Sequence, residues 1–192
     1  MDAADRLGLS PISKVRLHRL IFLTNCLAEV FSTLSPSQKI IKYKRGPYYP
    51  DVQWQLDRLV TMDLVTVDKL KLEKDEYGPW LEGDYCINNS GIKLIDQICK
   101  KQLGLSLKKY VDELVFAFIR IPVDHLDDIA LKDLNYGQAG IAEGALITFD
   151  EPDENKALLK IKEFENFASS MINNREFEKA RIYLQYLDKV VI

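Results

Sequence analysis

The sequence predicts an α+β fold that is mostly helical, in which an N-terminal winged helix with a β-hairpin wing precedes a helical C-terminal region. The central observation is the run KYKRGPYYPDVQWQLDRLVTMDLVTV over residues 42–67. It begins with a basic extended segment and a Gly-Pro turn, continues as a short amphipathic helix and ends in an alternating strand. This order is typical of the segment that leads into the recognition helix and wing of a winged helix. A long amphipathic helix before it, and two more at the end of the chain, complete the prediction.

Composition and charge favour a globular protein whose acidic half either meets a protein partner or is simply solvated. The chain has 192 residues, 47% hydrophobic and 29% charged, which is ordinary for a soluble globular protein. Residues 1–105 hold 15 Lys and Arg against 13 Asp and Glu, whereas residues 106–192 hold 11 against 16. A dedicated nucleic-acid binder is usually more basic, and the acidic half repels phosphate. We expect a winged-helix domain over residues 10–103 and a helical region over residues 105–192.

The elements of the first domain follow from caps and apolar spacing. Ser10-Pro11 predicts a helix start, with a polar cap and a proline at the first helical position. Steps of mostly three and four residues then predict an amphipathic helix of about five turns, and the recurring residues are Val15, Leu17, Leu20, Ile21, Leu23, Thr24, Leu27 and Phe31. Pro50-Asp51 starts the next helix. Alternation from Leu64 to Leu72, with a return over Asp84 to Ile87, predicts the wing. Tyr77-Gly78-Pro79-Trp80 is expected to lie in a polar loop between these two strands.

Caps and breaks divide the rest of the chain. Ser90 is expected to cap a helix, and the residues expected to face inward on it are Ile92, Leu94, Ile95 and Ile98. Ser106 is expected to cap another helix, which Pro122 closes. Two further helices lie on either side of Asn173-Asn174 and predict an antiparallel helical hairpin. The last helix has apolar residues beyond a single stripe, so we expect it to be buried on two sides, either within its own fold or against another subunit.

The motif KYKRGPYYPDVQWQLDRLVTMDLV, with LHRLIFLTN upstream, resembles a group of small bacterial winged-helix proteins. The group includes the YwgA-like and Panacea (SocA-type antitoxin) proteins, and the chain looks closest to the middle components of ABC-three-component and Lamassu-type anti-phage systems. The resemblance covers about residues 12–100. It implies a small subunit that accompanies an SMC-like ATPase and an effector, commonly a nuclease. The sequence departs from the pattern at Asp63, where the family tends to have glycine, but aspartate tolerates a left-handed backbone.

The helix from Asp51 to Met62 is the first candidate site. At about 100° per residue, the residues that fall opposite its apolar face are Trp54, Asp57, Arg58 and Thr61. Carboxylates on a groove-entering helix would lie among DNA phosphates, whereas an outward tryptophan beside arginine is typical of a protein-interface anchor. Three interpretations stay open: packing of Trp54 within the chain, a partner interface that includes Trp54, Arg58 and Thr61, or contact with DNA.

Two further candidate sites come from the basic segment and from the last helix. The possible nucleic-acid contact consists of Lys39, Lys42, Lys44, Arg45, Tyr48 and Tyr49. Cations interleaved with aromatic rings suit phosphate neutralisation and base contact. The alternatives are a solvated edge strand, since lysines protect edges from aggregation, and tyrosines that wedge two helices together. On the last helix, the expected interface residues are Tyr183, Tyr186 and Val190.

The residues offer little support for catalysis or metal binding. His18 and His125 lie in unrelated segments, and the three cysteines show neither metal-ligand spacing nor a disulfide framework. Cys26 and Cys99 fall on apolar helix faces and are expected to be small buried hydrophobes. No apolar run approaches the ~20 residues that a membrane span requires. We expect a soluble, cytoplasmic, non-enzymatic protein with no metal or cofactor of its own.

The expected function is therefore that of a non-catalytic accessory subunit in prokaryotic anti-phage or anti-plasmid defence. It would bridge an SMC-like ATPase and an effector nuclease, and any DNA contact would occur within that complex. The alternative is a winged-helix DNA-binding regulator or antitoxin. A regulator of this kind would bind duplex DNA in isolation with a steep salt dependence.

Overall fold

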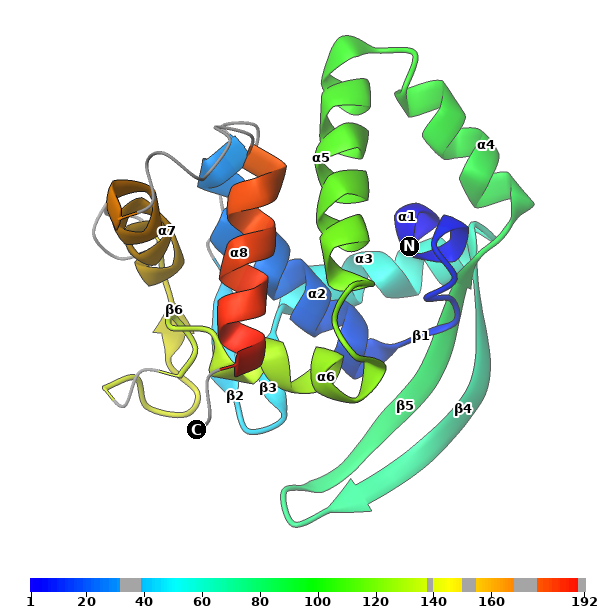
Figure 1. Cartoon of the computed structure of the whole chain (residues 1–192). Coiled ribbons are helices and arrows are strands. Elements are labelled where there is room, and N and C mark those ends of the chain that lie inside the picture. Colours follow the sequence, from blue (N-terminus) through cyan, green and yellow to red (C-terminus); the bar gives the residue numbers. More distant parts are fainter. Residues whose placement is uncertain (32–38, 138–139, 150–154, 168–175, 190–192) are drawn as a thin grey trace.

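The computed structural model describes residues 1–31, 39–137, 140–149, 155–167 and 176–189 (Figure 1). The chain has the predicted α+β fold and is mostly helical. Within these residues the helices are α1 (Asp2–Arg6), α2 (Lys14–Leu27), the 3₁₀ helix η1 (Ala28–Phe31), α3 (Pro50–Thr61), α4 (Asn89–Ile98), α5 (Gln102–Phe118), α6 (Val123–Lys132), α7 (Lys156–Phe167) and α8 (Glu176–Lys189). The strands are β1 (Ile12–Ser13), β2 (Ile40–Tyr43), β3 (Gly46–Tyr48), β4 (Val65–Asp75), β5 (Gly78–Ile87) and β6 (Leu146–Ile147).

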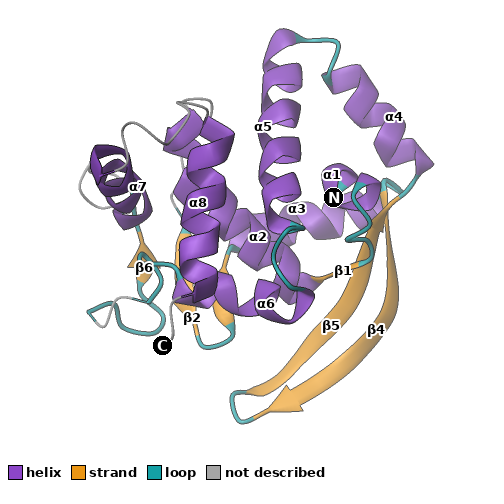
Figure 2. Ribbon diagram, in the orientation of Figure 1, coloured by secondary structure: helices purple, strands orange, loops and turns teal. Residues whose placement is uncertain are grey.

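The described strands form two small antiparallel sheets, with orders β1-β5-β4 and β3-β2-β6 (Figure 2). In the first sheet, β4 and β5 make a long hairpin whose far end projects away from the helices. In the second, β2 and β3 turn through Lys44 and Arg45, since Tyr43 pairs with Gly46. Gly46 has a φ of +127°, which favours glycine over any residue with a Cβ atom. The turn therefore places Lys44, which is exposed, next to Arg45, whose side chain is largely covered.

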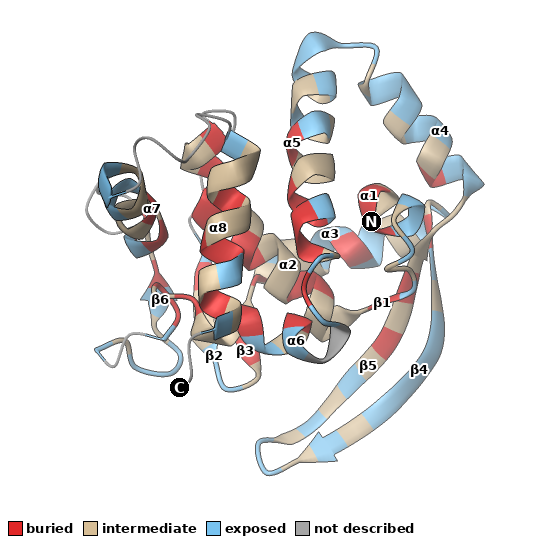
Figure 3. Ribbon diagram, in the orientation of Figure 1, coloured by how far each residue is buried: buried red, intermediate tan, exposed pale blue. Residues whose placement is uncertain are grey.

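Helix α2 runs through the main core. Its buried face, which includes Phe22 and Leu27, packs with Leu114 of α5 and with Tyr183 of α8 (Figure 3). A smaller cluster joins α1, α2, α3, α5 and the base of the β4–β5 hairpin, and it consists of Ala3, Ala4, Ile12, Leu17, Leu56, Val65, Tyr85 and Val115. Both clusters draw residues from either side of Gly104. The two halves of the chain thus share their hydrophobic cores.

Several helices begin at different residues from those predicted. Ile12 and Ser13 pair with β5, so α2 starts only at Lys14, where the Ser13 hydroxyl accepts from the N–H of Arg16 (3.2 Å). This strand pairing displaces the predicted start at Ser10-Pro11. Asn88, not Ser90, caps α4 through its side-chain oxygen, which accepts from the N–H of Gly91 (3.0 Å). Helix α5 starts at Gln102, so Ser106 lies inside it and caps nothing.

The β4–β5 hairpin is longer than the sequence indicated. Strand β4 continues to Asp75 and pairs with Gly78, so Trp80 lies in a strand and not in a loop. The tight turn after α3 depends on Asp63, whose φ of +53° is left-handed, as predicted for the position where glycine is missing. The carbonyl oxygen of Asp63 accepts from Asn88 Nδ2 (2.7 Å), which ties the two ends of the hairpin together.

The apolar face of α4 is covered only in part: Ile92 and Ile95 are half-buried, whereas Leu94 and Ile98, which were also expected to face inward, are exposed. Leu94 is 40% exposed and Ile98 is 45% exposed, although the spacing places both on the inward side. Gly91 is the buried residue of this helix, and an added Cβ atom there would lie 2.3 Å from the carbonyl oxygen of Leu64. The start of α4 thus touches the body of the molecule closely, while Leu94 and Ile98 stay exposed. Helical periodicity reports an apolar face but cannot say whether anything packs on it.

A buried polar network joins the C-terminal helices to α2. The carboxylate of Asp133 has no exposed surface and accepts from the hydroxyl of Tyr183 (2.8 Å) and from the N–H of Asn135 (2.8 Å). The side chain of Asn155 donates to the carbonyl oxygen of Cys26 on α2 (2.9 Å). Asn135 in turn accepts from the N–H of residue 156, at the start of α7 (2.7 Å). Each of these buried groups has a partner, as buried polar groups require.

The loop predicted at Asn173-Asn174 lies outside the described residues. Helices α7 and α8 contact each other through Phe164 and Tyr186, whose ring centroids lie 5.4 Å apart, and through the ion pair of Glu165 with Lys179 (2.5 Å). Helix α8 is buried by α5 and α6 as well as by α7. Of the two explanations for its wide apolar surface, burial within its own fold is the one observed.

We predict that Asp133 makes the stability of the chain depend on pH. Burial raises the pKa of this carboxyl group above its usual value. The folded state then holds a proton that the unfolded state releases at lower pH, so the free energy of unfolding falls as pH rises from about 4 through the raised pKa. Asp133→Asn should flatten this decline, which urea unfolding between about pH 4 and pH 8 would measure. Asp128→Asn, at an exposed position on α6, is the control and should keep the decline. Equal slopes for Asp133→Asn and the original chain would contradict the prediction.

Candidate functional site

Helix α3 is held against α2 by the tyrosine that precedes it. Tyr49 is buried, its N–H donates to His18 Nδ1 (3.2 Å), and its hydroxyl accepts from Asn25 Nδ2 (3.0 Å). His18 and Asn25 both lie on α2. Pro50 follows at the first helical position, where the backbone N–H that it lacks would have had no helical partner. The predicted wedge is confirmed for Tyr49, which is consequently a core residue and not a nucleic-acid contact.

The outer face of α3 carries an exposed tryptophan among carboxylates. Leu56 faces the smaller core cluster, whereas Trp54 is 65% exposed. Asp51 and Asp57 are exposed on the same helix. Packing of Trp54 within the chain, the first of the three interpretations, is therefore excluded. What remains is a large apolar ring in solvent on a face whose carboxylates would repel DNA phosphates.

Arg58 and Thr61 flank this tryptophan as the helical spacing predicted. Both residues are exposed. The hydroxyl of Thr61 donates to the carbonyl oxygen of Arg58 (2.8 Å), so it satisfies the end of the helix. The guanidinium of Arg58 provides the basic group on this outer face. Trp54, Arg58 and Thr61, together with Asp51 and Asp57, are called the α3 surface below.

Within the basic segment, the guanidinium of Arg45 is already bound by other groups of the same chain. It donates to both carboxylate oxygens of Asp75 (2.8 and 2.6 Å) and to the carbonyl oxygen of Gly78 (2.8 Å). It also lies over the ring of Trp80, 4.0 Å from the centroid. The hydrogen bonds from Arg45 lower the pKa of the Asp75 carboxyl group. Arg45 thus fastens the far end of the β4–β5 hairpin to the β2–β3 turn.

The lysines of the basic segment also face other parts of the chain. Lys44 pairs with Glu143 (3.6 Å) and lies 4.8 Å from the ring centroid of Tyr77. Lys42 lies 5.4 Å from the ring centroid of Tyr136. Lys39 is exposed at the start of β2. Lys42 and Lys44 thus lie against other parts of the chain, and Lys39 is left in solvent.

The remaining predicted residues are placed as follows. Tyr48 is half-buried, with its ring centroid 5.2 Å from that of His18. Tyr183 has no exposed surface and donates to Asp133, so this residue belongs to the core and not to a docking surface as the sequence suggested. Tyr186 is half-buried against Phe164. Val190 lies outside the described residues. Of the predicted interface residues that are described, only those on α3 are exposed.

A cavity of about 350 Å³ lies where α2, the β2–β3 turn and β5 meet. Its walls are largely aromatic and apolar, and the lining residues are Lys14, Val15, His18, Tyr43, Arg45, Gly46, Pro47, Tyr48, Pro79 and Trp80. The polar groups of the wall already have partners inside the chain: Arg45 binds Asp75, and Lys14 donates to the carbonyl oxygen of Leu81. A cavity of this kind suits an apolar or aromatic group and offers no unpaired charge to a substrate.

His18, which lines this cavity, and Cys26, which is buried in the main core, both have structural roles. His18 Nδ1 accepts a backbone N–H, so its proton lies on Nε2, which faces Gln53 Oε1 (3.4 Å). Burial lowers the pKa of His18 and keeps the ring neutral. Burial likewise raises the pKa of the Cys26 thiol, as suits the small buried hydrophobe that was predicted. Neither group is placed as a nucleophile with a base beside it.

Among the described residues, no group of three or more His, Cys, Asp or Glu side chains could hold a metal ion. Within the same residues, no helix combines the length and apolarity needed to cross a membrane. Comparisons with family models, with curated proteins and with solved structures find no match.

Sequence reasoning missed the partner of Arg45. Asp75 and Gly78 lie thirty or more residues further along the chain, in what was expected to be a polar loop. The turn residues around Gly78 were visible, but nothing in their order indicates that the end of the hairpin bends back to β2. The tertiary contact therefore had no local signal, and the same cations suggested nucleic acid when considered alone.

We predict that Arg45 anchors the hairpin and does not bind DNA. Arg45→Met keeps the aliphatic stem but removes the charged bonds to Asp75 and Gly78. Amide hydrogen exchange should then become faster between residues 75 and 83, while the α2 amides stay protected. Lys39→Met, at an exposed position, is the matched control and should leave exchange unchanged. Unchanged exchange in Arg45→Met would show that the contact does not hold the hairpin.

Proposed function

We propose that this chain is a non-catalytic subunit that docks onto a larger protein through the α3 surface. The observation that carries the proposal is Trp54, a tryptophan 65% exposed on a regular helix. Tryptophan and arginine are the residues that most often dominate binding energy in protein interfaces. Arg58 is exposed one turn further along α3. Asp51 and Asp57 at its edge would repel phosphate and would instead pair with cations of a protein partner.

We further propose that α2, α3 and the β4–β5 hairpin form a winged helix. The order of elements supports it, since α3 occupies the position of the recognition helix and the hairpin follows directly as the wing. In this interpretation the helix that would enter a DNA groove presents its tryptophan to protein. The fold supplies a rigid frame, and the function depends on the residues that the frame presents.

The assembly we propose is a prokaryotic anti-phage or anti-plasmid defence complex of the Lamassu or ABC-three-component type. Support comes from the resemblance of residues 12–100 to the middle components of such systems. The chain would bridge an SMC-like ATPase and an effector nuclease, and ATP and Mg²⁺ would belong to these partners. The neutral, buried His18 and the inert Cys26 fit a chain that leaves chemistry to others.

The rival function is DNA binding by a regulator or antitoxin, and the geometry favours it less. A DNA reader needs cations free to neutralise phosphates. Arg45 is bound to Asp75, Lys44 pairs with Glu143, and Tyr49 is buried. The proposal therefore places any DNA contact in the complex and assigns none to the isolated chain.

We predict that Trp54→Ala disrupts assembly with an SMC-like ATPase encoded beside this chain. Loss of a central interface tryptophan should weaken the affinity by about 30-fold, or roughly 2 kcal/mol. Co-purification and titration calorimetry would measure it. Phe167→Ala, which removes a ring that is 95% exposed on α7, is the matched control and should bind normally. Equal affinity of Trp54→Ala and the original chain would remove the α3 surface from the proposal.

The DNA alternative has its own test. Fluorescence anisotropy of the isolated chain with a labelled duplex at about 50 mM salt should give no saturable binding, because Arg45 and Lys44 are paired within the chain and the outer face of α3 carries carboxylates. Binding that weakens steeply between about 50 and 200 mM salt would favour the regulator instead. In that case Lys42→Glu and Lys44→Glu should abolish it, and Lys74→Glu at the far end of the hairpin should not.

A further inference from the structure

The cavity where the start of α2, the β2–β3 turn and β5 meet has the size of a small-molecule site. Its volume of about 350 Å³ lies near the lower end of the ~300–1,000 Å³ of pockets that hold small ligands. Three walls converge on it, formed by residues 14, 15 and 18 of α2, by residues 43 and 45–48 of the turn and its strands, and by residues 79 and 80 of β5. The cavity admits one compact group, whereas a partner helix about 10–12 Å across is too large for it.

Flat rings make up much of these walls. The ring centroid of Tyr48 lies 5.2 Å from that of His18 and 6.3 Å from that of Tyr43. On the β5 side, the guanidinium of Arg45 lies 4.0 Å from the ring centroid of Trp80. Aromatic rings pack best against another planar ring, in offset-stacked or edge-to-face contact. The walls therefore favour a planar aromatic ligand over a saturated one.

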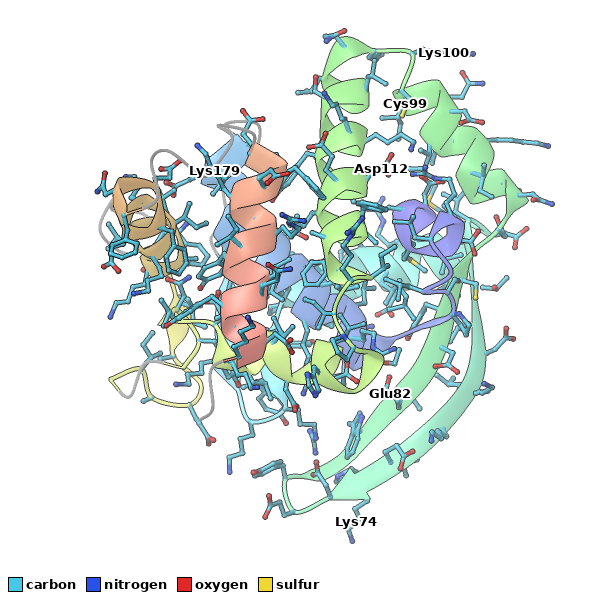
Figure 4. The ribbon with its side chains drawn as sticks, viewed as in Figure 1. Lys74, Glu82, Cys99, Lys100, Asp112 and Lys179 are labelled. Atoms are coloured by element: carbon cyan, nitrogen blue, oxygen red, sulfur yellow. The ribbon has the colours of Figure 1, made fainter. Side chains whose placement is uncertain are left out.

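The charges around the cavity disfavour a charged ligand. Lys14 and Arg45 lie in the wall and would repel a cation. Each has a carboxylate beside it: Asp75 accepts from the guanidinium of Arg45 (2.6 Å), and Glu82 accepts from the backbone N–H of Lys14 (2.9 Å). Glu82, labelled on β5 in Figure 4, would repel an anion. A charged ligand would lose its hydration here without a charge of its own to pair with.

One polar group of the lining lacks a partner. The hydroxyl of Tyr48, a half-buried residue, has no hydrogen-bond partner among the described residues. The other polar groups on the aromatic residues are engaged: the hydroxyl of Tyr43 accepts from Arg45 (3.1 Å), and the indole N–H of Trp80 donates to Glu82 (3.1 Å). A hydroxyl that lines a cavity without a partner suits a ligand with a hydrogen-bonding group of its own.

We propose that this cavity binds a small, uncharged, planar aromatic molecule that carries one hydrogen-bonding group. The ring of the ligand would pack among Tyr43, Tyr48 and Trp80, and its polar group would bond to the Tyr48 hydroxyl. This site is independent of docking through the α3 surface, because the two share no residue. Failure of the Trp54→Ala prediction would therefore leave the cavity untouched.

The ligand would also strengthen the attachment of the hairpin. Trp80 is held at the cavity by Arg45, which bonds to Asp75 and Gly78 as well. A ligand that packs on Trp80 binds only the state in which the end of the hairpin lies against the β2–β3 turn, and it stabilises that state. Bound ligand should consequently slow amide hydrogen exchange between residues 75 and 83, while exchange in α8 stays unchanged.

The test titrates the full chain with 2-naphthol, an uncharged bicyclic ring with one hydroxyl. Titration calorimetry should show saturable binding, with a dissociation constant between about 10 µM and 1 mM for a ligand of this size. Decahydro-2-naphthol, the saturated analogue, should bind at least about fivefold more weakly because it has no flat ring. The charged analogues 2-naphthoate and 2-naphthylmethylammonium should also bind more weakly than 2-naphthol.

Variants of the chain locate the site. Tyr48→Phe keeps the ring and removes the hydroxyl, so it should weaken the binding of 2-naphthol by about three- to tenfold. Val15→Phe places a larger side chain in the wall formed by α2 and should abolish binding. Tyr77→Phe, which removes the hydroxyl of an exposed tyrosine outside the lining, is the matched control and should bind normally. Circular dichroism confirms that each variant is folded.

Several outcomes would overturn the proposal. They are absence of saturable binding, equal binding of decahydro-2-naphthol, and tighter binding of either charged analogue. Binding that Val15→Phe or Tyr48→Phe leaves unchanged would place the ligand elsewhere. Unchanged hydrogen exchange between residues 75 and 83 at saturating 2-naphthol would do the same. A proline-rich peptide that binds in place of 2-naphthol would assign the aromatic walls to a different class of ligand.

Discussion

The structure depends on one buried carboxylate and the groups that satisfy it. Asp133 has no exposed surface, yet it holds hydrogen bonds from α8 and from its own turn, and Asn155 extends the network to the backbone of α2. A buried polar group without partners is strongly destabilising, so these elements must meet in one arrangement only. The network explains why the C-terminal helices do not form a separate body. It holds α8 on the main core, while α3 packs against another side of α2.

Much of the fold could be predicted where a local signal decides the outcome. Proline at the start of α3, the left-handed backbone at Asp63 and the buried thiol of Cys26 each depend on residues close in sequence. The helix starts were predicted less well. Ser10-Pro11 is a good cap by composition, but pairing of Ile12 with β5 wins, because a strand partner more than seventy residues away satisfies the backbone there. Local preference is a weak guide wherever a distant strand competes.

The candidate sites were likewise predicted well where the signal is local and poorly where it depends on residues far away in the sequence. Helical spacing correctly separated Trp54 from the buried Leu56, and the structure then decided that Trp54 faces solvent. The basic segment was the misleading part. Four cations in seven residues suggested phosphate, but Arg45 and Lys44 find their partners at Asp75 and Glu143, and no pattern in the sequence links those positions. Exposure is equally invisible to periodicity, which is why the exposed Leu94 and Ile98 of α4 were expected to lie inside.

The side chains along the two edges of the β4–β5 hairpin limit how a partner protein can bind to it. Strand β4 is an outer strand and carries Lys69, Lys71 and Lys74 along its length. The opposite side of β5 is occupied by Lys14 and Arg45, which donate to the carbonyl oxygens of Leu81 and Gly78. The outer edge of β4 carries backbone N–H and C=O groups, but its lysines oppose pairing with a foreign strand, and two carbonyl oxygens on the margin of β5 already have partners. The charged edge thus works against polymerisation through the longest β-structure of the described residues.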